Sequence, residues 1–296
     1  MAFNWKTFRT RTLTAAVFVL VMAAGLFVNQ WSFLLLFSLI HFGCWVEYVR
    51  LVRRIDPGYK NAGAVIPAIA MTGGWTLMLW MCSPAFFTIC GIHVNVLGGW
   101  PLLTALVLLL IAGFVKPANH LKNFSHSCFG LLYISLPLAL MMDLYGKGFD
   151  HPVPFPFEQS EVAVRYPVLA LMVIFSLWIS DTMAYIVGSL MGKHPLSSIS
   201  PKKTWEGTAG GIILAAVVMG FLGYVVLGDA ADATIISLIA AIAGTFGDLL
   251  ESKLKRLAQV KDSGTIMPGH GGFLDRFDSL LLATPFVWLY VAFAMR

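Results

Sequence analysis

The sequence predicts an all-α, polytopic membrane protein, and composition together with long apolar runs carries that prediction. Of the 296 residues, 58% are hydrophobic and only 12% are charged, and the mean hydropathy is +0.79. Several uncharged runs reach about 18 residues, which is enough for an α-helix to cross the hydrocarbon core of a bilayer. No long soluble domain remains once these runs are set aside, so the composition argues against a soluble protein.

We expect about nine transmembrane helices. They are placed at residues 13–28, 31–49, 64–82, 102–115, 124–142, 168–190, 210–227, 233–250 and 279–295. Residues 83–101 contain Pro84, Pro101 and three glycines, so this region is expected to form a re-entrant or interfacial piece.

The distribution of positive charge predicts the orientation. With the N-terminus in the cytoplasm, the predicted cytoplasmic segments hold 17 of the 20 lysines and arginines, as the positive-inside rule requires. Those segments are 1–12, 50–63, 116–123, 191–209 and 251–278. The C-terminus then lies outside, and the net charge of +5 reflects cytoplasmic loops rather than nucleic-acid binding.

Two regions are expected along the chain. Residues 1–123 would form a group of N-terminal transmembrane helices, and residues 124–296 a catalytic region with cytoplasmic loops 191–209 and 251–278. The four cysteines form no CxxC pair, so they are expected to be buried small hydrophobic residues, although a disulfide between Cys82 and Cys90 stays open.

The segment 248–278 concentrates ten charges between two apolar runs. Asp248, Glu251, Ser252 and Lys255 have the spacing i, i+3, i+4, i+7, which places them on one helix face. A carboxylate there can hold a hard cation, and Lys255 with Arg256 can meet phosphate. The alternative is a helix end that carries salt-bridged, snorkelling charges.

A glycine-rich turn follows, with the sequence PGHGGFLDRFD over residues 268–278. Glycines around His270 let backbone N–H groups approach an anion closely. Asp275 and Asp278 open the last predicted helix, where acids also act as favourable caps. Because Asp248 and Asp275 lie on two helices that meet the same interface, they predict a Mg²⁺-phosphate site. Asp278 is a further candidate ligand.

Two upstream features are expected to join this site. The segment Ser200–Gly207 (SPKKTWEG) is a candidate triphosphate cradle, although its lysines also fit ordinary positive-inside charge. Within the sixth span, Asp181 and Tyr185 are one turn apart, and an intramembrane acid normally faces a polar interior. Asp181 is therefore another candidate metal ligand, whereas Glu47, near the end of the second span, is expected to be structural.

The charged segment resembles the signature of the phosphatidate cytidylyltransferases, or CDP-diacylglycerol synthases, S-x-x-K-R-x4-K-D followed by H-G-G-x-x-D-R-x-D. The matching residues are Ser252, Lys255, Arg256, Lys261, Asp262, His270, Gly271, Gly272, Asp275, Arg276 and Asp278. The resemblance covers the C-terminal half, and Met267 is the one departure. It implies that CTP and phosphatidate give CDP-diacylglycerol and pyrophosphate, with Mg²⁺, an all-helical membrane fold and a homodimer.

Roles follow from the resemblance and the charge pattern together. We expect catalysis to depend on Asp248, Lys255, Arg256, His270, Asp275 and Arg276. Substrate binding is assigned to Asp181, Tyr185, Ser200, Lys202, Lys203, Thr204, Glu206, Ser252, Lys261, Asp262, Gly271 and Gly272. Mg²⁺, with room for a second cation, would bind Asp248 and Asp275. The expected location is a bacterial inner membrane, with the active site at its cytoplasmic face.

Two alternatives differ in chemistry. A CTP-dependent polyprenol or lipid kinase would have a similar membrane site but would transfer the γ-phosphate. An ion-coupled transporter would use Asp181 and Asp248 as coupling acids, but it has no need of the glycine-rich turn, and the chain shows no inverted repeat. P-loop, HExxH and GxSxG motifs are all absent from the sequence.

Overall fold

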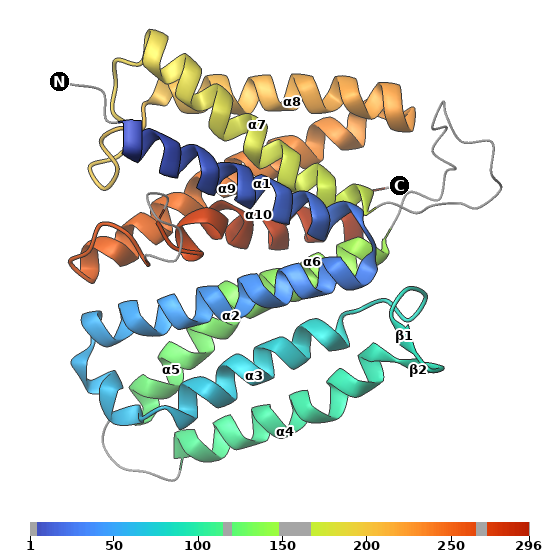
Figure 1. Cartoon of the computed structure of the whole chain (residues 1–296), viewed down its shortest axis with the longest axis vertical. Helices are drawn as coiled ribbons and strands as arrows, with labels where there is room; N and C mark the ends of the chain where they lie inside the picture. Colours follow the sequence, from blue (N-terminus) through green and yellow to red (C-terminus); the bar gives the residue numbers. More distant parts are fainter. Residues whose placement is uncertain (1–4, 115–119, 148–166, 265–270, 296) are drawn as a thin grey trace. The chain divides into compact units, whose positions relative to one another are not determined.

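The computed structural model describes residues 5–114, 120–147, 167–264 and 271–295 (Figure 1). The chain divides into two compact units. One unit combines Met1–Met142 with Leu254–Phe277, and the other combines Asp143–Lys253 with Asp278–Arg296. The division into these units does not test the boundary that the sequence predicts between residues 123 and 124. That boundary stays a prediction.

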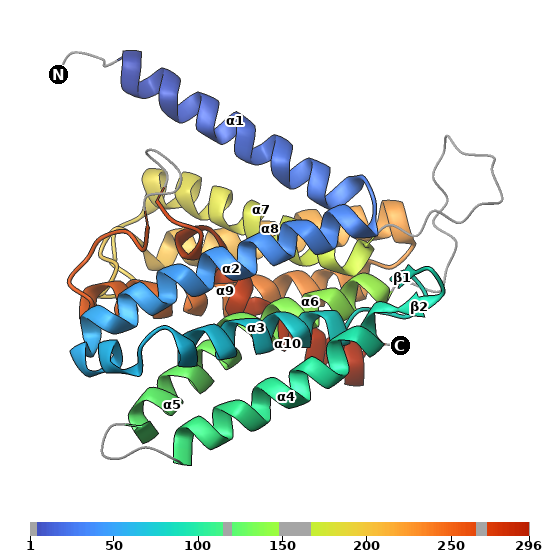
Figure 2. The same ribbon diagram turned by 60° about the horizontal axis from the view of Figure 1, so that its bottom comes forward.

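The first unit is built mainly from the N-terminal helices. Its elements are α1 (Trp5–Phe27), α2 (Gln30–Ile55), the 3₁₀-helix η1 (Pro57–Ala62), α3 (Val65–Trp80), β1 (Thr88–Ile89), β2 (Ile92–His93), α4 (Val94–Phe114), α5 (His120–Gly130), the π-helix η2 (Leu131–Ser135) and α6 (Leu136–Gly146), whose last turn belongs to the second unit. Helix α3 packs against α4 and also contacts α2 and α5. Figure 2 shows α1 diverging from α2 beyond their connecting turn.

Local sequence explains why α2 begins where it does. Asn29 separates α1 from α2, because its side chain accepts the N–H groups of Trp31 and Ser32, both at 2.9 Å, while the Ser32 hydroxyl accepts the N–H of Asn29 at 3.1 Å. This reciprocal pattern is a capping box, which starts a helix firmly.

Residues 83–101 contain a β-hairpin and the first turns of α4 rather than a re-entrant loop, while the alternative of an interfacial location stays a prediction. Strands β1 and β2 pair antiparallel through a two-residue turn in which Cys90 and Gly91 have φ of +50° and +80°. Two left-handed residues give a turn that matches the twist of paired strands. Residues 94–101 then form the first turns of α4, with Pro101 inside the helix.

The second unit contains α7 (Val168–Met191), α8 (Trp205–Leu227) and most of α9 (Ala230–Leu257) and α10 (Leu274–Phe293). Helices α7 and α8 lie side by side (Figure 1). A Cβ atom added to Gly207 would lie 2.8 Å from the Gly188 Cα, and one added to Gly211 would lie 2.6 Å from the Ser180 carbonyl oxygen. Small residues at these positions let the two backbones approach closely.

Seven helical segments among the described residues are long and apolar enough to cross a membrane. They are Gln30–Ile55, Val94–Ala112, Lys122–Gly146, Val168–Met191, Trp205–Leu227, Ala230–Leu257 and Leu274–Phe293. Two shorter apolar segments, Thr12–Phe27 and Val65–Trp80, accompany them. Large apolar side chains face outward, as lipid contact requires: Trp100, Leu20 and Phe221 are 75%, 68% and 65% exposed. The all-α membrane fold is confirmed, while the count of nine and the orientation stay predictions.

Candidate active site

Three carboxylates converge in the second unit. Asp248 and Glu251 lie one turn apart on α9, Asp278 lies on α10, and one oxygen from each falls within 4.8 Å of the others. Glu251 is fully buried and Asp278 is 8% exposed. Carboxylates gathered this closely in a buried place repel one another unless positive charge offsets them. The cluster therefore has the donor set of a cation site.

A glycine allows the two helices to bring these acids together. A Cβ atom on Gly247 would lie 2.5 Å from the Asp278 carbonyl oxygen and 3.1 Å from the Ser279 Cα. Any larger residue would push α10 away from α9. The carboxylate cluster thus depends on a residue that carries no functional group itself.

Positive charge reaches the cluster from the loop between α7 and α8. Lys203 forms an ion pair with Asp248, and their side chains are 31% and 21% exposed. The structure therefore brings together two of the residues that the sequence singled out, Lys203 and Asp248, whereas Asp181 and Tyr185 are exposed on α7.

The loop that carries Lys203 is folded rather than extended. The N–H of Lys203 donates to the Ser200 carbonyl at 3.1 Å, and its carbonyl accepts the N–H of Leu196 at 2.7 Å. Thr204 caps α8 by accepting the N–H of Gly207 at 3.2 Å. These bonds set the place of Lys203, while Lys202 beside it is exposed.

Glu206, in the first turn of α8, contacts the same loop through its carboxylate. Its carboxylate accepts the backbone N–H groups of Lys193 and His194 at 3.1 and 3.2 Å and lies 2.5 Å from His194 Nδ1. Because the Glu206 carboxylate contacts three donors of this loop, it holds the loop in position.

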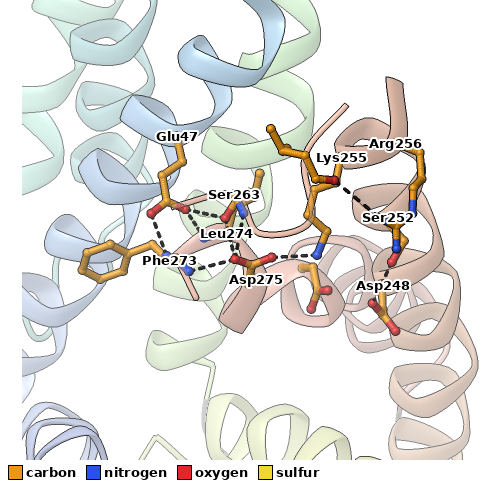
Figure 3. A network of polar contacts seen from close by, with 12 residues as sticks. Glu47, Asp248, Ser252, Lys255, Arg256, Ser263, Phe273, Leu274 and Asp275 are labelled. Carbon is orange, nitrogen blue, oxygen red and sulfur yellow. Dashed lines mark hydrogen bonds and ion pairs between the residues drawn. The ribbon is translucent and has the colours of Figure 1, made fainter. Parts of the chain in front are cut away.

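Asp275 has a different environment, within the first unit. Its Oδ1 lies 2.6 Å from Lys255 Nζ, and its Oδ2 accepts the N–H groups of Ser263 and Gly272 at 2.9 and 2.8 Å (Figure 3). The Lys255 and Asp275 side chains are only 13% and 11% exposed. Both oxygens of Asp275 are thus occupied by protein donors, so its expected role as a metal ligand stays a prediction.

Glu47, from α2, is the second carboxylate of this network. It is fully buried, and it accepts the N–H groups of Phe273 and Leu274 at 3.0 and 2.9 Å and the hydroxyl of Ser263 at 2.7 Å. Leu274 begins α10, and the first N–H groups of a helix have no acceptor inside the helix. A carboxylate is favoured at this positive end of the helix.

The glycine-rich turn binds the protein's own carboxylates. Gly271 has φ of +82°, and a Cβ atom there would lie 2.7 Å from Asp275 Oδ2. A Cβ atom on Gly272 would overlap the carboxylate of Glu47. Backbone donors of this turn therefore meet an anion, as the glycines suggested, but for Gly272 and Phe273 that anion belongs to the chain. His270 lies outside the described residues.

The remaining described residues of the signature make long contacts or are exposed to solvent. Ser252 Oγ lies 3.5 Å from Asp248 Oδ1, a long contact, and Arg256 Nη1 lies 3.5 Å from the Val260 carbonyl. Among the described residues of the signature, the exposed ones are Arg256, Lys261, Asp262 and Arg276. Exposed cations at this position are accessible to a phosphate from solution.

Sequence reasoning named Glu251 on the charged helix face without assigning it as a ligand, expected Glu47 to be structural, and did not mention Ser263. Glu251 had a signal, since it is i+3 from Asp248 on a charged helix face. An acid within an apolar span is also a signal, which applies to Glu47. Nothing in the local sequence marks Ser263, because its partners come from distant parts of the chain.

The fold and the carboxylate cluster define a helical membrane protein with a largely buried group of acids between two of its helices. The sequence profile of the cytidylyltransferase family matches residues 9–294, and the chain belongs to that family.

Curated relatives agree with this family. The chain is 34% identical over 229 residues to the phosphatidate cytidylyltransferase of Bacillus subtilis (strain 168), which covers 73% of the chain and 76% of the relative. It is 42% identical over 159 residues to that of Staphylococcus saprophyticus, and 40% identical over 164 residues to that of Staphylococcus aureus (strain COL). Each of these two matches covers 52% of the chain and 58% of the relative's length.

Proposed function

We propose that this protein transfers the cytidylyl group of CTP to phosphatidate, which gives CDP-diacylglycerol and pyrophosphate. Membership of the cytidylyltransferase family and the names of the similar proteins support the reaction. The observation that carries the proposal is the cluster of Asp248, Glu251 and Asp278 on α9 and α10, with Lys203 paired to Asp248. Phosphoryl chemistry depends mainly on charge stabilisation and alignment, which such a cluster provides.

Mg²⁺ is the cation that we propose for this cluster. Carboxylate oxygens are the donors that a hard cation prefers, and Mg²⁺ commonly binds one or two of them together with water and phosphate oxygens. Asp248 and Asp278 would hold it, with Glu251 beside them. When bound, the ion neutralises charge on the transferring phosphoryl group. A second cation, and Asp181 and Asp275 as ligands, remain proposals on the strength of the sequence.

The chain's own cations would bring two anionic substrates together. Lys203 can share its ammonium between Asp248 and a triphosphate, and Lys202, next to it, is exposed. Lys255 is held by Asp275, so its ammonium has a fixed place before substrate arrives. A positioned charge needs no reorganisation during the reaction, which makes it more effective than a mobile one.

Phosphate itself is the nucleophile in this account. A phosphatidate oxygen attacks the α-phosphorus of CTP, the bond from that phosphorus to the bridging oxygen breaks, and pyrophosphate leaves with the electron pair. Because the attacking oxygen is already anionic, no strong general base is needed. The protein residues therefore bind, orient and neutralise charge.

The substrate phosphatidate is a lipid, and the apolar helices place the protein where that lipid resides. We propose that the site faces the cytoplasm from a bacterial inner membrane, because CTP is cytoplasmic and most of the positive charge lies in the predicted cytoplasmic segments. The protein is proposed to act as a homodimer.

The test is product formation by the purified protein in detergent micelles. With CTP, phosphatidate and Mg²⁺, we expect CDP-diacylglycerol by mass spectrometry and an equal amount of pyrophosphate, both abolished when either substrate or Mg²⁺ is omitted. Asp278→Asn serves as the matched impaired variant, which should form much less product at the same limiting Mg²⁺ concentration. A folded, monodisperse wild-type protein that forms neither product would contradict the proposed function.

A further inference from the structure

We propose that Glu47 is a positioning residue for the reaction: from α2 it fixes the start of α10 and thereby sets the place of Asp275 and of the Lys255 ammonium. The inference rests on the proposed function and adds to it a residue outside the signature segment. It concerns contacts within the first unit alone.

The Glu47 carboxylate is buried and held by hydrogen bonds. It is fully buried, and both of its oxygens accept hydrogen bonds, Oε1 from the N–H of Phe273 and Oε2 from the N–H of Leu274 and the hydroxyl of Ser263. A buried charge is costly unless such donors surround it. These donors all come from the segment that leads into α10, so Glu47 determines where that segment lies.

Ser263 connects the two carboxylates of the network. Its hydroxyl oxygen lies 2.7 Å from Glu47 Oε2 and 2.9 Å from Asp275 Oδ2, and its N–H donates to Asp275 (Figure 3). A hydroxyl has one proton, so Ser263 donates to one of the two acids at a time. Glu47 and Asp275 therefore share a donor, and a change at one acid alters how the other is held.

Close packing leaves the Glu47 carboxylate little freedom. A Cβ atom on Gly264 or on Gly272 would overlap it, and a Cβ atom on Gly43, one turn earlier in α2, would overlap the ring of Phe273. The turn thus fits around the carboxylate on two sides. Asp275 follows this turn directly, so displacement of the turn displaces Asp275 and with it the ammonium that Asp275 holds.

Glu47→Gln tests this role with little change of shape. One oxygen becomes an amide NH₂ group, which donates and so opposes the N–H or O–H group that faces it. We expect kcat at saturating CTP and phosphatidate to fall by about 10–100-fold, the usual effect of removing a group that orients a functional residue. Tyr48→Phe is the matched control, because Tyr48 is the next residue of α2, is buried and donates to the His126 carbonyl at 2.7 Å. It should lose stability while kcat stays within about twofold.

A double-mutant cycle with Ser263→Ala distinguishes positioning from general weakening. If both residues act through Asp275, Glu47→Gln combined with Ser263→Ala should cost much less than the product of the single losses in kcat, since contacting residues couple. Independent, multiplicative losses would overturn the proposal, and so would a Glu47→Gln protein with the kcat of Tyr48→Phe. Should Glu47→Gln not fold, Ser263→Ala decides alone: a kcat equal to wild type refutes the link. Absence of CDP-diacylglycerol with the wild-type protein would instead refute the proposed function.

Discussion

Lys255 Nζ lies 2.6 Å from Asp275 Oδ1, which ties the last turn of α9 to the first turn of α10. Both residues belong to the signature segment, and both side chains are almost buried. Along the same helices, Asp248 precedes Lys255 by two turns and Asp278 follows Asp275 by three residues. Helix α9 therefore carries Lys255 and two members of the carboxylate cluster, and α10 carries Asp275 and the third.

Removal of the ammonium should be costly in both stability and activity. Lys255→Met leaves Asp275 as a buried charge without its cation, which we expect to lower the free energy of unfolding by about 3–5 kcal/mol. CDP-diacylglycerol formation should fall by at least about 100-fold, as expected when a pre-placed charge is lost. Lys253→Met is the control, because Lys253 lies on the same helix and is exposed. If thermal unfolding and turnover of the two variants coincide, the ion pair has no such role.

Asp278 should govern the response to Mg²⁺. Asp278→Asn removes one charge from the carboxylate cluster, so the Mg²⁺ concentration for half-maximal activity is expected to rise by about 10–100-fold. Asp229→Asn is the matched control. Asp229 Oδ1 accepts the N–H groups of Ala231 and Asp232 at the start of α9, where Asn caps equally well. An unchanged Mg²⁺ titration for Asp278→Asn would remove Asp278 from the metal site.

Gly271 should not tolerate a side chain. Its φ of +82° costs an L-residue about 1–2 kcal/mol, and a Cβ atom would also press on Asp275 Oδ2. Gly228 has a similar φ of +73° at the end of α8 but no atom within 4 Å of an added Cβ. We expect Gly271→Ala to lose most of its activity, whereas Gly228→Ala should be mildly destabilised and active. Equal activity of the two variants would show that the contact with Asp275 is unimportant.

The cysteines offer a test of orientation. The structure has four free cysteines, of which Cys90 is exposed in the β1–β2 turn whereas Cys44 and Cys82 are buried. Burial keeps a bulky reagent away from the Cys44 and Cys82 thiols. In intact spheroplasts, a membrane-impermeant maleimide should label the wild-type protein but not Cys90→Ser. Labelling that requires inverted vesicles would place this turn in the cytoplasm and reverse the predicted topology.

The sequence could predict what depends on local pattern. Apolar runs located the helices, and the i, i+3 spacing of Asp248 and Glu251 placed two carboxylates on one face of α9. It could not show that Asp278 joins these two residues, because that depends on the close approach that Gly247 permits. Nor could it show that Glu47 caps α10, since the partners are more than 200 residues apart. The glycine-rich turn looked like a substrate cradle because local sequence does not show which anion its backbone meets.

The position of the radiolabel from CTP tests the central claim most directly. Purified protein is given phosphatidate, Mg²⁺ and CTP labelled in either the α- or the γ-phosphate, and the lipid fraction is extracted and counted. Our account predicts that the α-label enters the lipid as CDP-diacylglycerol while the γ-label leaves as pyrophosphate. A γ-label in the lipid would contradict cytidylyl transfer and identify a CTP-dependent lipid kinase instead.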